Sequence, residues 1–246
     1  YELNLFFVED WKQTKPAMER IDFGSPRVRW LPDGRRLTFE KTDRGHQRFR
    51  IIEVDTQTAA VRNILDEQSK TFIWSAHNEH GPLTTYLNQS NEIIYVSERD
   101  GWKHLYLIDG EQGAITHQIT RGEWVMRGID LIDEEHRQIW FRASGMIAGQ
   151  DPYLIHHCRV NFDGTGLVRL TDGNGNHSIR FSPDRQFVID AYSRVDLAPV
   201  HELRRTSDGA LVCSLETADT TELVASGWKA PEVFSAKGRD GTTEIW

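Results

Sequence analysis

The feature that most constrains the fold of this chain is a complete β-hairpin within residues 93–109. An apolar strand, Ile93–Val96, comes before the turn Asp100-Gly101, and a second apolar strand, Leu105–Ile108, follows it. β-Branched and aromatic side chains favour strands. Glycine takes the positive φ of a tight turn without steric cost. The chain turns again at Asp109-Gly110, so this stretch predicts antiparallel β structure.

The same order of strands and turns recurs four times. The predicted strands are Val28–Trp30, Leu37–Phe39, Phe49–Asp55 and Val61–Leu65; Ile93–Val96, Leu105–Ile108 and Ile115–Thr120; Gln138–Arg142, Tyr153–Val160 and Leu167–Thr171; and Ser178–Phe181, Phe187–Asp190, Val200–Leu203 and Leu211–Leu215. Acidic turns at Asp55, Asp109, Asp163 and Asp208 are 54, 54 and 45 residues apart. A period of about 40–50 residues with about four strands is typical of propeller blades. The fold class predicted is all-β, a β-propeller fragment of about four four-stranded blades.

The remaining sequence offers little helix. No long stretch has an apolar period of three to four residues, and the polar residues 9–20 predict a loop or a short helix. No run of about 18 apolar residues predicts a membrane span. The formal net charge of −8 disfavours nonspecific binding to nucleic acid or to an anionic membrane. We therefore expect neither as a partner.

The chain has two cysteines, Cys158 and Cys213, both in predicted strands. Because cysteine packs well in cores, two buried free thiols are the favoured interpretation. The sequence leaves a disulfide open, since it cannot place the two Cα atoms within reach. No zinc-ligand spacing occurs, and we expect no metal and no cofactor.

Several segments carry a family resemblance. They are Ser97–Asp109, Ile119–Ile129, Asp43–Arg50, Arg159–Leu167 and Tyr192–Asp196. In this order they closely resemble the later propeller blades of bacterial dipeptidyl peptidase IV-like serine peptidases, of the prolyl oligopeptidase clan, across roughly residues 25–246. The turns Pro32-Asp33-Gly34 and Pro183-Asp184-Arg185 resemble those that open blades in peptidase-capping propellers and in TolB-like propellers. The chain is thus identified as the second half of such an N-terminal propeller.

The resemblance implies an eight-bladed propeller that covers a C-terminal α/β-hydrolase domain, which removes dipeptides from peptide N-termini. The family's nucleophile lies in a Gly-x-Ser-x-Gly elbow. Ser144-Gly145 and Ser226-Gly227 lack the first glycine of that motif, so we predict no catalytic residue in this chain. The family's amine-gripping glutamate pair follows an aromatic residue. Asp133-Glu134-Glu135 has no such residue before it and predicts a solvated turn.

The expected organisation has three parts. Residues 1–24 are a partial blade or connecting segment, residues 25–231 are blades, and residues 232–246 are a strand hairpin that leads towards the absent hydrolase domain. Because the chain starts at Tyr1, a leader could have preceded it. Export or a periplasmic location is suspected, and the compartment itself stays unassigned.

Four residues are candidates for the wall of a substrate channel: Arg99, Trp102, Trp124 and Arg127. Arginine suits peptide carboxylates and carbonyls. The competing interpretation is that the arginines form salt bridges between blades and that the tryptophans pack inside blades.

Two other groups of polar residues have ordinary structural interpretations. Asp172–Asn176 offers alternate oxygens, but it lacks the glycine and glutamate positions of a calcium loop and predicts a tight loop between blades. His156 and His157, and also His77 and His80, predict surface or hydrogen-bonding roles.

Two functions of different class follow. The first is the non-catalytic propeller portion of a dipeptidyl peptidase IV-like exopeptidase, which gates and positions peptides. Its partners would be the peptide substrate and the C-terminal α/β-hydrolase domain. The second is a stand-alone TolB-like propeller that serves as a protein-interaction platform. Because blade faces are normally covered by neighbours, the chain should self-associate, or residues 1–24 and 216–246 should partly cover its open faces.

Overall fold

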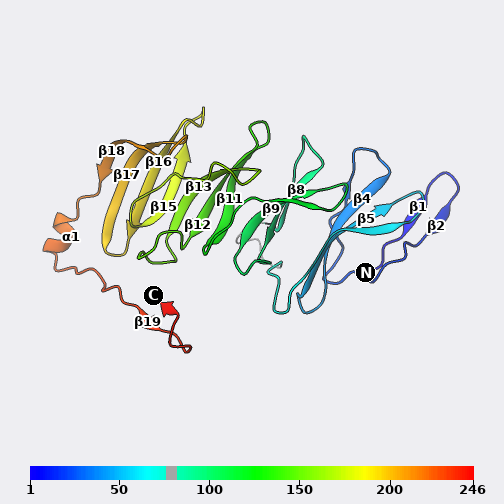
Figure 1. Cartoon of the computed structure of the whole chain (residues 1–246), viewed down its shortest axis with the longest axis horizontal. Coiled ribbons are helices and arrows are strands. Elements are labelled where there is room, and N and C mark those ends of the chain that lie inside the picture. Colours follow the sequence, from blue (N-terminus) through cyan, green and yellow to red (C-terminus); the bar gives the residue numbers. More distant parts are fainter. Residues whose placement is uncertain (76–81) are drawn as a thin grey trace. The chain divides into compact units, whose positions relative to one another are not determined.

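The computed structural model describes residues 1–75 and 82–246, and strands dominate this part of the chain (Figure 1). They form four four-stranded sheets, each built from strands consecutive in sequence. The first sheet contains β3 (Arg29–Trp30), β4 (Arg36–Thr42), β5 (Arg48–Asp55) and β6 (Val61–Gln68); the second contains β7 (Thr84–Tyr86), β8 (Glu92–Ser97), β9 (His104–Asp109) and β10 (Ile115–Gln118). The third contains β11 (Val125–Asp133), β12 (Gln138–Ser144), β13 (Ile155–Asn161) and β14 (Val168–Arg169); the fourth contains β15 (Asn176–Phe181), β16 (Phe187–Arg194), β17 (Leu197–Arg205) and β18 (Leu211–Thr217).

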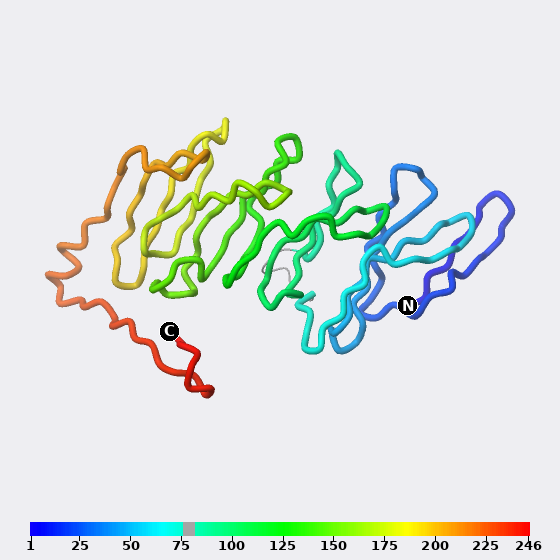
Figure 2. The backbone as a smooth tube through the Cα atoms, viewed as in Figure 1, coloured from blue at the N-terminus to red at the C-terminus, as the bar shows by residue number. Residues whose placement is uncertain are grey.

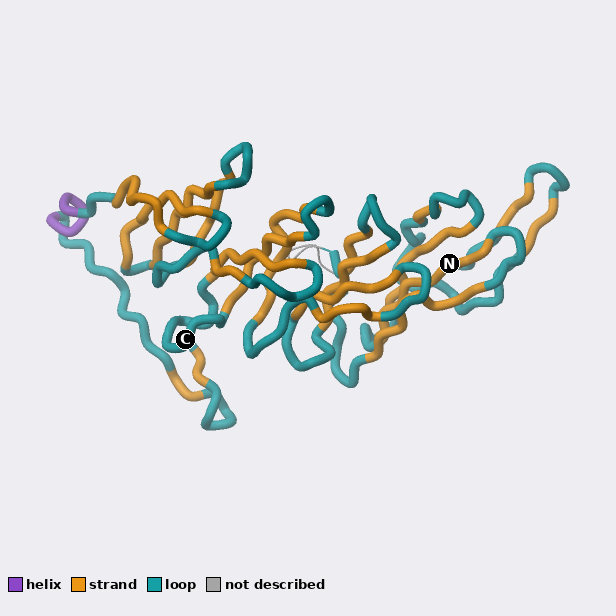
Figure 3. Tube along the Cα trace, turned by 45° about the horizontal axis from the view of Figure 1, so that its top comes forward, coloured by secondary structure: helices purple, strands orange, loops and turns teal. Residues whose placement is uncertain are grey.

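Shorter elements complete the described chain. β1 (Leu5–Phe7) pairs with β2 (Lys12–Thr14), and β19 (Ala236–Lys237) pairs with β20 (Glu244–Ile245). Figure 3 shows the single short helix of the described residues, α1 (Thr221–Ala225). Within the same residues, no helix has the length and apolar character needed to cross a membrane.

The chain divides into two compact units, whose backbone path Figure 2 traces. The first unit comprises residues 1–99 and 106–117, and the second comprises residues 100–105 and 118–246. In the first unit, β5 is apolar along most of its length because both of its faces are buried. Phe49 and Ile51 join one core cluster, while Ile52 and Val54 join another. The sequence pattern of this strand therefore shows little alternation.

The core of the second unit is centred on the third sheet. Phe141 and Cys158 are paired across β12 and β13, and both are fully buried. The indole of Trp124 stacks on the Phe141 ring with centroids 5.8 Å apart. Offset aromatic pairs of this kind add stability beyond their buried area.

The acidic turns are closed by side-chain hydrogen bonds. Asp55 Oδ1 accepts from the backbone N–H groups of residues 57 and 58, and Asp109 Oδ1 accepts from those of residues 111 and 112. These bonds satisfy turn donors locally. The backbone register shows, however, that Arg205, not Asp208, takes the place of Asp55 and Asp109, because the N–H of each bonds the carbonyl oxygen five residues later. Asp208 lies three residues further into its turn.

Turns that join the third and fourth strands of a sheet also contact the preceding sheet. Gly209 follows β17, and a Cβ there would lie 2.2 Å from the carbonyl oxygen of Arg169 in β14. Gly164 follows β13, and its Cβ would lie 3.0 Å from the carbonyl oxygen of Gln118 in β10. Both glycines have a positive φ. The close approach and the left-handed backbone each require glycine at these positions.

Three sequence expectations need correction. Residues 9–20 contain no helix and are only partly loop, because β2 starts at Lys12 after a turn in which Trp11 has φ 57°. Cys213 is exposed, since it lies in β18, the edge strand of the fourth sheet, whose residues are all exposed. Residues 216–246 are exposed almost throughout and cover no open face, whereas Leu3, Leu5 and Met18 do pack on the first sheet.

Candidate functional site

Arg99 joins the first and second sheets. Its guanidinium forms an ion pair with Glu67 in β6, and its Nε donates to Ser97 Oγ at 3.1 Å. Ser97 Oγ in turn donates to Glu67 Oε1 at 2.7 Å. The guanidinium also lies over the ring of Tyr106, 5.0 Å from its centroid. With these contacts Arg99 is engaged inside the first unit, and a role in a substrate channel stays a prediction.

The other three predicted channel residues belong to the second unit. Trp124 is only 7% exposed, and its ring meets His104 edge-on at 4.7 Å in addition to stacking on Phe141. Trp102 is 40% exposed and sits in the turn before β9. Arg127 Nε donates to Ser144 Oγ at 3.0 Å, and among the described residues it has no carboxylate partner. No hydrogen bond, ion pair or ring contact joins Trp102, Trp124 and Arg127 within that part of the chain.

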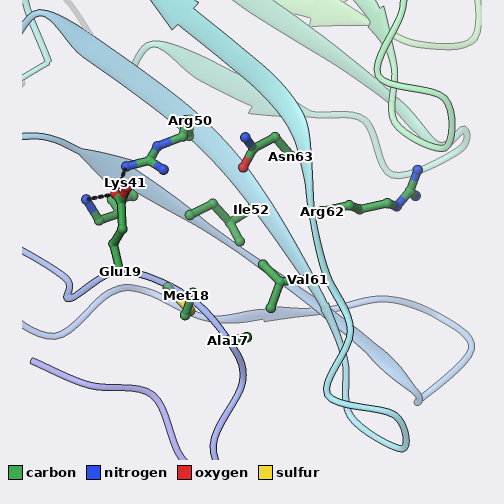
Figure 4. A pocket seen from close by; sticks show the side chains of 9 residues that line it. All are labelled: Ala17, Met18, Glu19, Lys41, Arg50, Ile52, Val61, Arg62 and Asn63. Carbon is green, nitrogen blue, oxygen red and sulfur yellow. Dashed lines mark hydrogen bonds and ion pairs between the residues drawn. The ribbon is translucent and has the colours of Figure 1, made fainter.

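A buried charge cluster that the sequence analysis missed lies on the first sheet (Figure 4). The side chains of Lys41 and Arg50 are almost fully buried. Arg50 Nη2 lies 2.8 Å from Glu19 Oε2 and 2.5 Å from Asp43 Oδ1, and Lys41 pairs with Asp43 and approaches Glu19 and Asp22. Burial opposes ionisation of Asp43, yet hydrogen bonds from Lys41 and Arg50 hold its pKa below the ordinary value. The hydrogen bond from Arg50 likewise lowers the pKa of Glu19.

A cavity of about 560 Å³ lies beside this cluster, between the Ala17–Glu19 segment and strands β5 and β6. Its walls include Met18, Ile52 and Val61 as well as Arg62. Arg62 Nε pairs with Glu53 at 2.6 Å, and Arg62 Nη1 donates to the carbonyl oxygen of Glu111 at 2.6 Å. The cations around the cavity are therefore paired within the protein. This arrangement favours a structural role, which fastens residues 19–22 to the first sheet.

A second cavity in the first unit, of about 920 Å³, is different in character. It is lined by residues 21–29, by β4 and by β7. Arg29 lies over the Tyr86 ring, 4.6 Å from its centroid. Glu40 accepts hydrogen bonds from the hydroxyls of Thr84 and Tyr86. Burial and the nearby Glu40 charge raise the pKa of Tyr86. The volume is within the range of ligand-binding pockets.

The histidines of the second unit are held by hydrogen bonds. His157 Nδ1 lies 2.7 Å from Asp130 Oδ2, and His177 Nδ1 lies 2.8 Å from Asp190 Oδ1. His156 contacts the hydroxyl of Thr171 and the amide of Gln150. Across residues 1–75 and 82–246, no three His, Cys, Asp or Glu side chains gather as a metal site. His77 and His80 lie outside the described residues.

Two acidic segments singled out in the sequence lie in connections. Asp172–Asn176 joins the third and fourth sheets, and two of its carbonyl oxygens accept from the protein: that of Gly173 faces His177 Nε2 at 2.7 Å, and that of Asn174 accepts from Arg194 Nη1 at 2.7 Å. Asp133-Glu134-Glu135 lies at the turn between β11 and β12, as expected. Asp133 Oδ1 accepts from the His136 N–H at 3.0 Å, which closes that turn.

A comparison with protein families decides the identity of the chain. The family model described as dipeptidyl peptidase IV (DPP IV) N-terminal region matches residues 12–199, about three quarters of the chain. The chain belongs to this DPP IV N-terminal family. The fold class predicted from the sequence, an all-β propeller fragment made of four-stranded modules, is confirmed.

Individual relatives agree with this assignment. The chain is 27% identical over 207 residues to a probable dipeptidyl peptidase 4 of Emericella nidulans, covering 77% of this chain and 26% of the relative. It is 26% identical over 195 residues to one of Aspergillus flavus, covering 78% and 25%. The chain thus spans about a quarter of the length of these DPP IV relatives.

Solved structures show the same fold. The crystal structure of Porphyromonas gingivalis dipeptidyl peptidase 4 matches with a TM-score of 0.67 at 20% identity, covering 97% of this chain and 33% of that one. A putative dipeptidyl aminopeptidase IV from Bacteroides ovatus matches with a TM-score of 0.65 at 19% identity, covering 97% and 35%.

Proposed function

We propose that this chain is the non-catalytic propeller portion of a DPP IV-like serine exopeptidase. In this proposal it forms part of the wall of a chamber that admits peptides and positions them for a C-terminal α/β-hydrolase domain of the same polypeptide. The match of residues 12–199 to the DPP IV N-terminal region carries the proposal. The sequence contains no Gly-x-Ser-x-Gly elbow, which is the motif that presents the nucleophile in such hydrolases.

The physical role would be orientation. Contacts with parts of a peptide remote from the cleaved bond hold that bond near the nucleophile, and effective molarity can contribute several kcal/mol to catalysis, on the order of 7–11 kcal/mol in well-oriented systems. Two of the predicted channel residues support this role by their availability: Arg127 has no carboxylate partner among the described residues, and Trp102 is partly exposed. Arg99 and Trp124 would instead hold the wall together.

The proposal includes the organisation of the chain. Residues 25–231 would be propeller blades, residues 1–24 a partial blade or connection, and residues 232–246 the hairpin that leads to the hydrolase. The exposed edge strand β18 supports self-association of the isolated chain, because an unpaired strand edge can pair with another copy. Sedimentation at increasing concentration tests this: a rise in mean mass is expected, and one constant monomer mass would contradict it.

Two measurements test the function. The reading frame downstream of residue 246 should encode a Gly-x-Ser-x-Gly elbow; a stop codon directly after it would support an interaction platform instead. The purified chain should not release p-nitroaniline from a Gly-Pro-p-nitroanilide substrate, whereas the full-length polypeptide should. Turnover by the purified chain above a buffer blank would overturn the non-catalytic assignment.

A further inference from the structure

The 920 Å³ cavity of the first unit has an aromatic rim. The imidazole of His46 lies between two phenylalanine rings, with its centroid 5.0 Å from that of Phe23 and 5.0 Å from that of Phe72. Phe23 and His46 both line the cavity. Phe23 is 62% exposed and Phe72 is 43% exposed. These rings are stacked on one another at the surface, so their faces and edges are accessible to a ligand.

The rim is held in a fixed conformation. Phe23 and His46 have φ values of 58° and 54°, in the left-handed region that non-glycine residues seldom adopt. His46 Nδ1 lies 3.3 Å from Ser75 Oγ, and that hydroxyl lies 3.0 Å from Thr42 Oγ1. Backbone strain of this kind persists where the surroundings determine it, and it concentrates at ligand-binding sites.

The charges of the cavity are unbalanced. Glu40 is satisfied by two hydroxyl donors, from Thr84 and Tyr86. Among the described residues, neither Arg27 nor Arg29 has a carboxylate partner, although both line the cavity. Because Arg29 rests with its face on the Tyr86 ring, the N–H groups at the edge of its guanidinium remain directed away from that ring. The cavity therefore offers two arginines to a ligand anion.

From this arrangement we propose that the cavity binds an acidic, proline-containing peptide segment. Its carboxylate would pair with Arg27 and Arg29, and its proline ring would lie on Phe23 and His46. Charge complementarity selects the carboxylate, since charge-assisted hydrogen bonds from arginine are among the strongest polar contacts. Proline-rich segments suit aromatic-lined grooves because their extended conformation is already formed and loses little entropy on binding. The inference rests on the proposed function, in which this face belongs to a peptide-admitting chamber.

The test uses the 246-residue chain and two blocked peptides, acetyl-Pro-Pro-Glu-Pro-Pro-amide and its Lys counterpart. Binding is measured by calorimetry at low and at moderate salt. The Glu peptide should bind at least about tenfold more tightly than the Lys peptide, a difference that added salt reduces. Equal affinity of the two peptides, or no binding of either, would overturn the proposal.

Variants locate the site. The double variant Arg27→Gln/Arg29→Gln should abolish the preference for the Glu peptide. His46→Asn should weaken binding of the Glu peptide several-fold, because asparagine tolerates the left-handed backbone but removes the stacking ring. Trp11→Asn is the matched control: Trp11 is also aromatic, has φ 57° and is 89% exposed, but it lies on the β1–β2 turn. It should leave affinity unchanged. An effect of Trp11→Asn equal to that of His46→Asn would refute this location.

The two proposals fail separately. Calorimetry detects peptide binding without any hydrolysis, so a downstream reading frame that lacks the elbow would defeat the peptidase assignment only. If the full-length polypeptide cleaves Gly-Pro-p-nitroanilide while the chain binds neither peptide, only the acidic-peptide site is overturned.

Discussion

Gly113 lies directly against the carbonyl oxygen of Ile64: a Cβ at position 113 would be 2.2 Å from that oxygen. Gly113 belongs to the turn after β9 in the second sheet, and Ile64 belongs to β6, the last strand of the first sheet. Gly164 and Gly209 repeat this relation to β10 and β14. A backbone contact without an intervening side chain therefore fastens successive sheets.

Substitution of Gly113 by alanine should destabilise the chain strongly. The left-handed backbone, φ 73°, costs a side chain about 1–2 kcal/mol, and the collision with rigid backbone adds about 1–3 kcal/mol of overpacking. Urea unfolding followed by tryptophan fluorescence measures the loss. Gly34→Ala is the control, because Gly34 has φ 64° and nothing within 4 Å of its Cβ position; it should cost only the backbone part. Equal losses for the two variants would show that the contact with Ile64 is unimportant.

The hydroxyl of Thr120 should be needed for stability. Thr120 Oγ1 accepts from the Leu105 N–H at 2.9 Å and lies 3.1 Å from His104 Nδ1, and Thr120 and His104 are both buried. Thr120→Val keeps the shape but leaves these polar groups unpaired, at a cost of about 1–3 kcal/mol. Thr120→Ser retains the hydroxyl and should lose less. Thermal unfolding compares the two, and a valine variant as stable as the serine variant would contradict the prediction.

Stability should fall as the pH falls from about 6.5 to about 4. Burial, with the positive charges of His177 and Arg169, lowers the pKa of His156 to about 4. In this window the unfolded histidine binds a proton that the folded one does not, so acid favours unfolding. The contribution is at most about 3 kcal/mol. The ring signals of His156 in an NMR titration check the cause: a midpoint at or above pH 6.5 would refute it.

The two thiols should react at very different rates. Cys213 is exposed, whereas Cys158 is buried and its pKa is raised by burial to about 12. Because the thiolate is the reactive form, Ellman's reagent should modify one thiol per native chain and two in guanidinium chloride. Cys213→Ser should abolish the native reaction. Rapid modification of two thiols in the native chain would contradict the burial of Cys158.

The predictability of the fold depends on how local its signals are. The strands around Phe49–Asp55 and Leu105–Ile108 were predicted because apolar runs end at turn residues that act locally. β11 was missed as a strand because register shifts at Met126/Gly128 and Ile129/Leu131 break its alternation. β7 was missed because it has only three residues, two of them threonine.

Site geometry was less accessible to sequence reasoning. The partners of Arg50 include Glu19, 31 residues earlier, and no local pattern indicates such a pair. Charged residues at inward positions of apolar strands, Lys41 and Arg50, were the available signal. The stacking of Phe23 on His46 likewise depends on a fold that brings two turns together. The roles of Arg99, Trp102, Trp124 and Arg127 in a channel stay predictions.

The glycine contacts between sheets have an evolutionary consequence. Each contact meets a main-chain carbonyl, which every amino acid supplies, so the neighbouring strand can change its side chains without losing the junction. Modules joined in this way can be duplicated and can then diverge independently. Such tolerance is consistent with structures that align over 97% of the chain at only 19–20% identity.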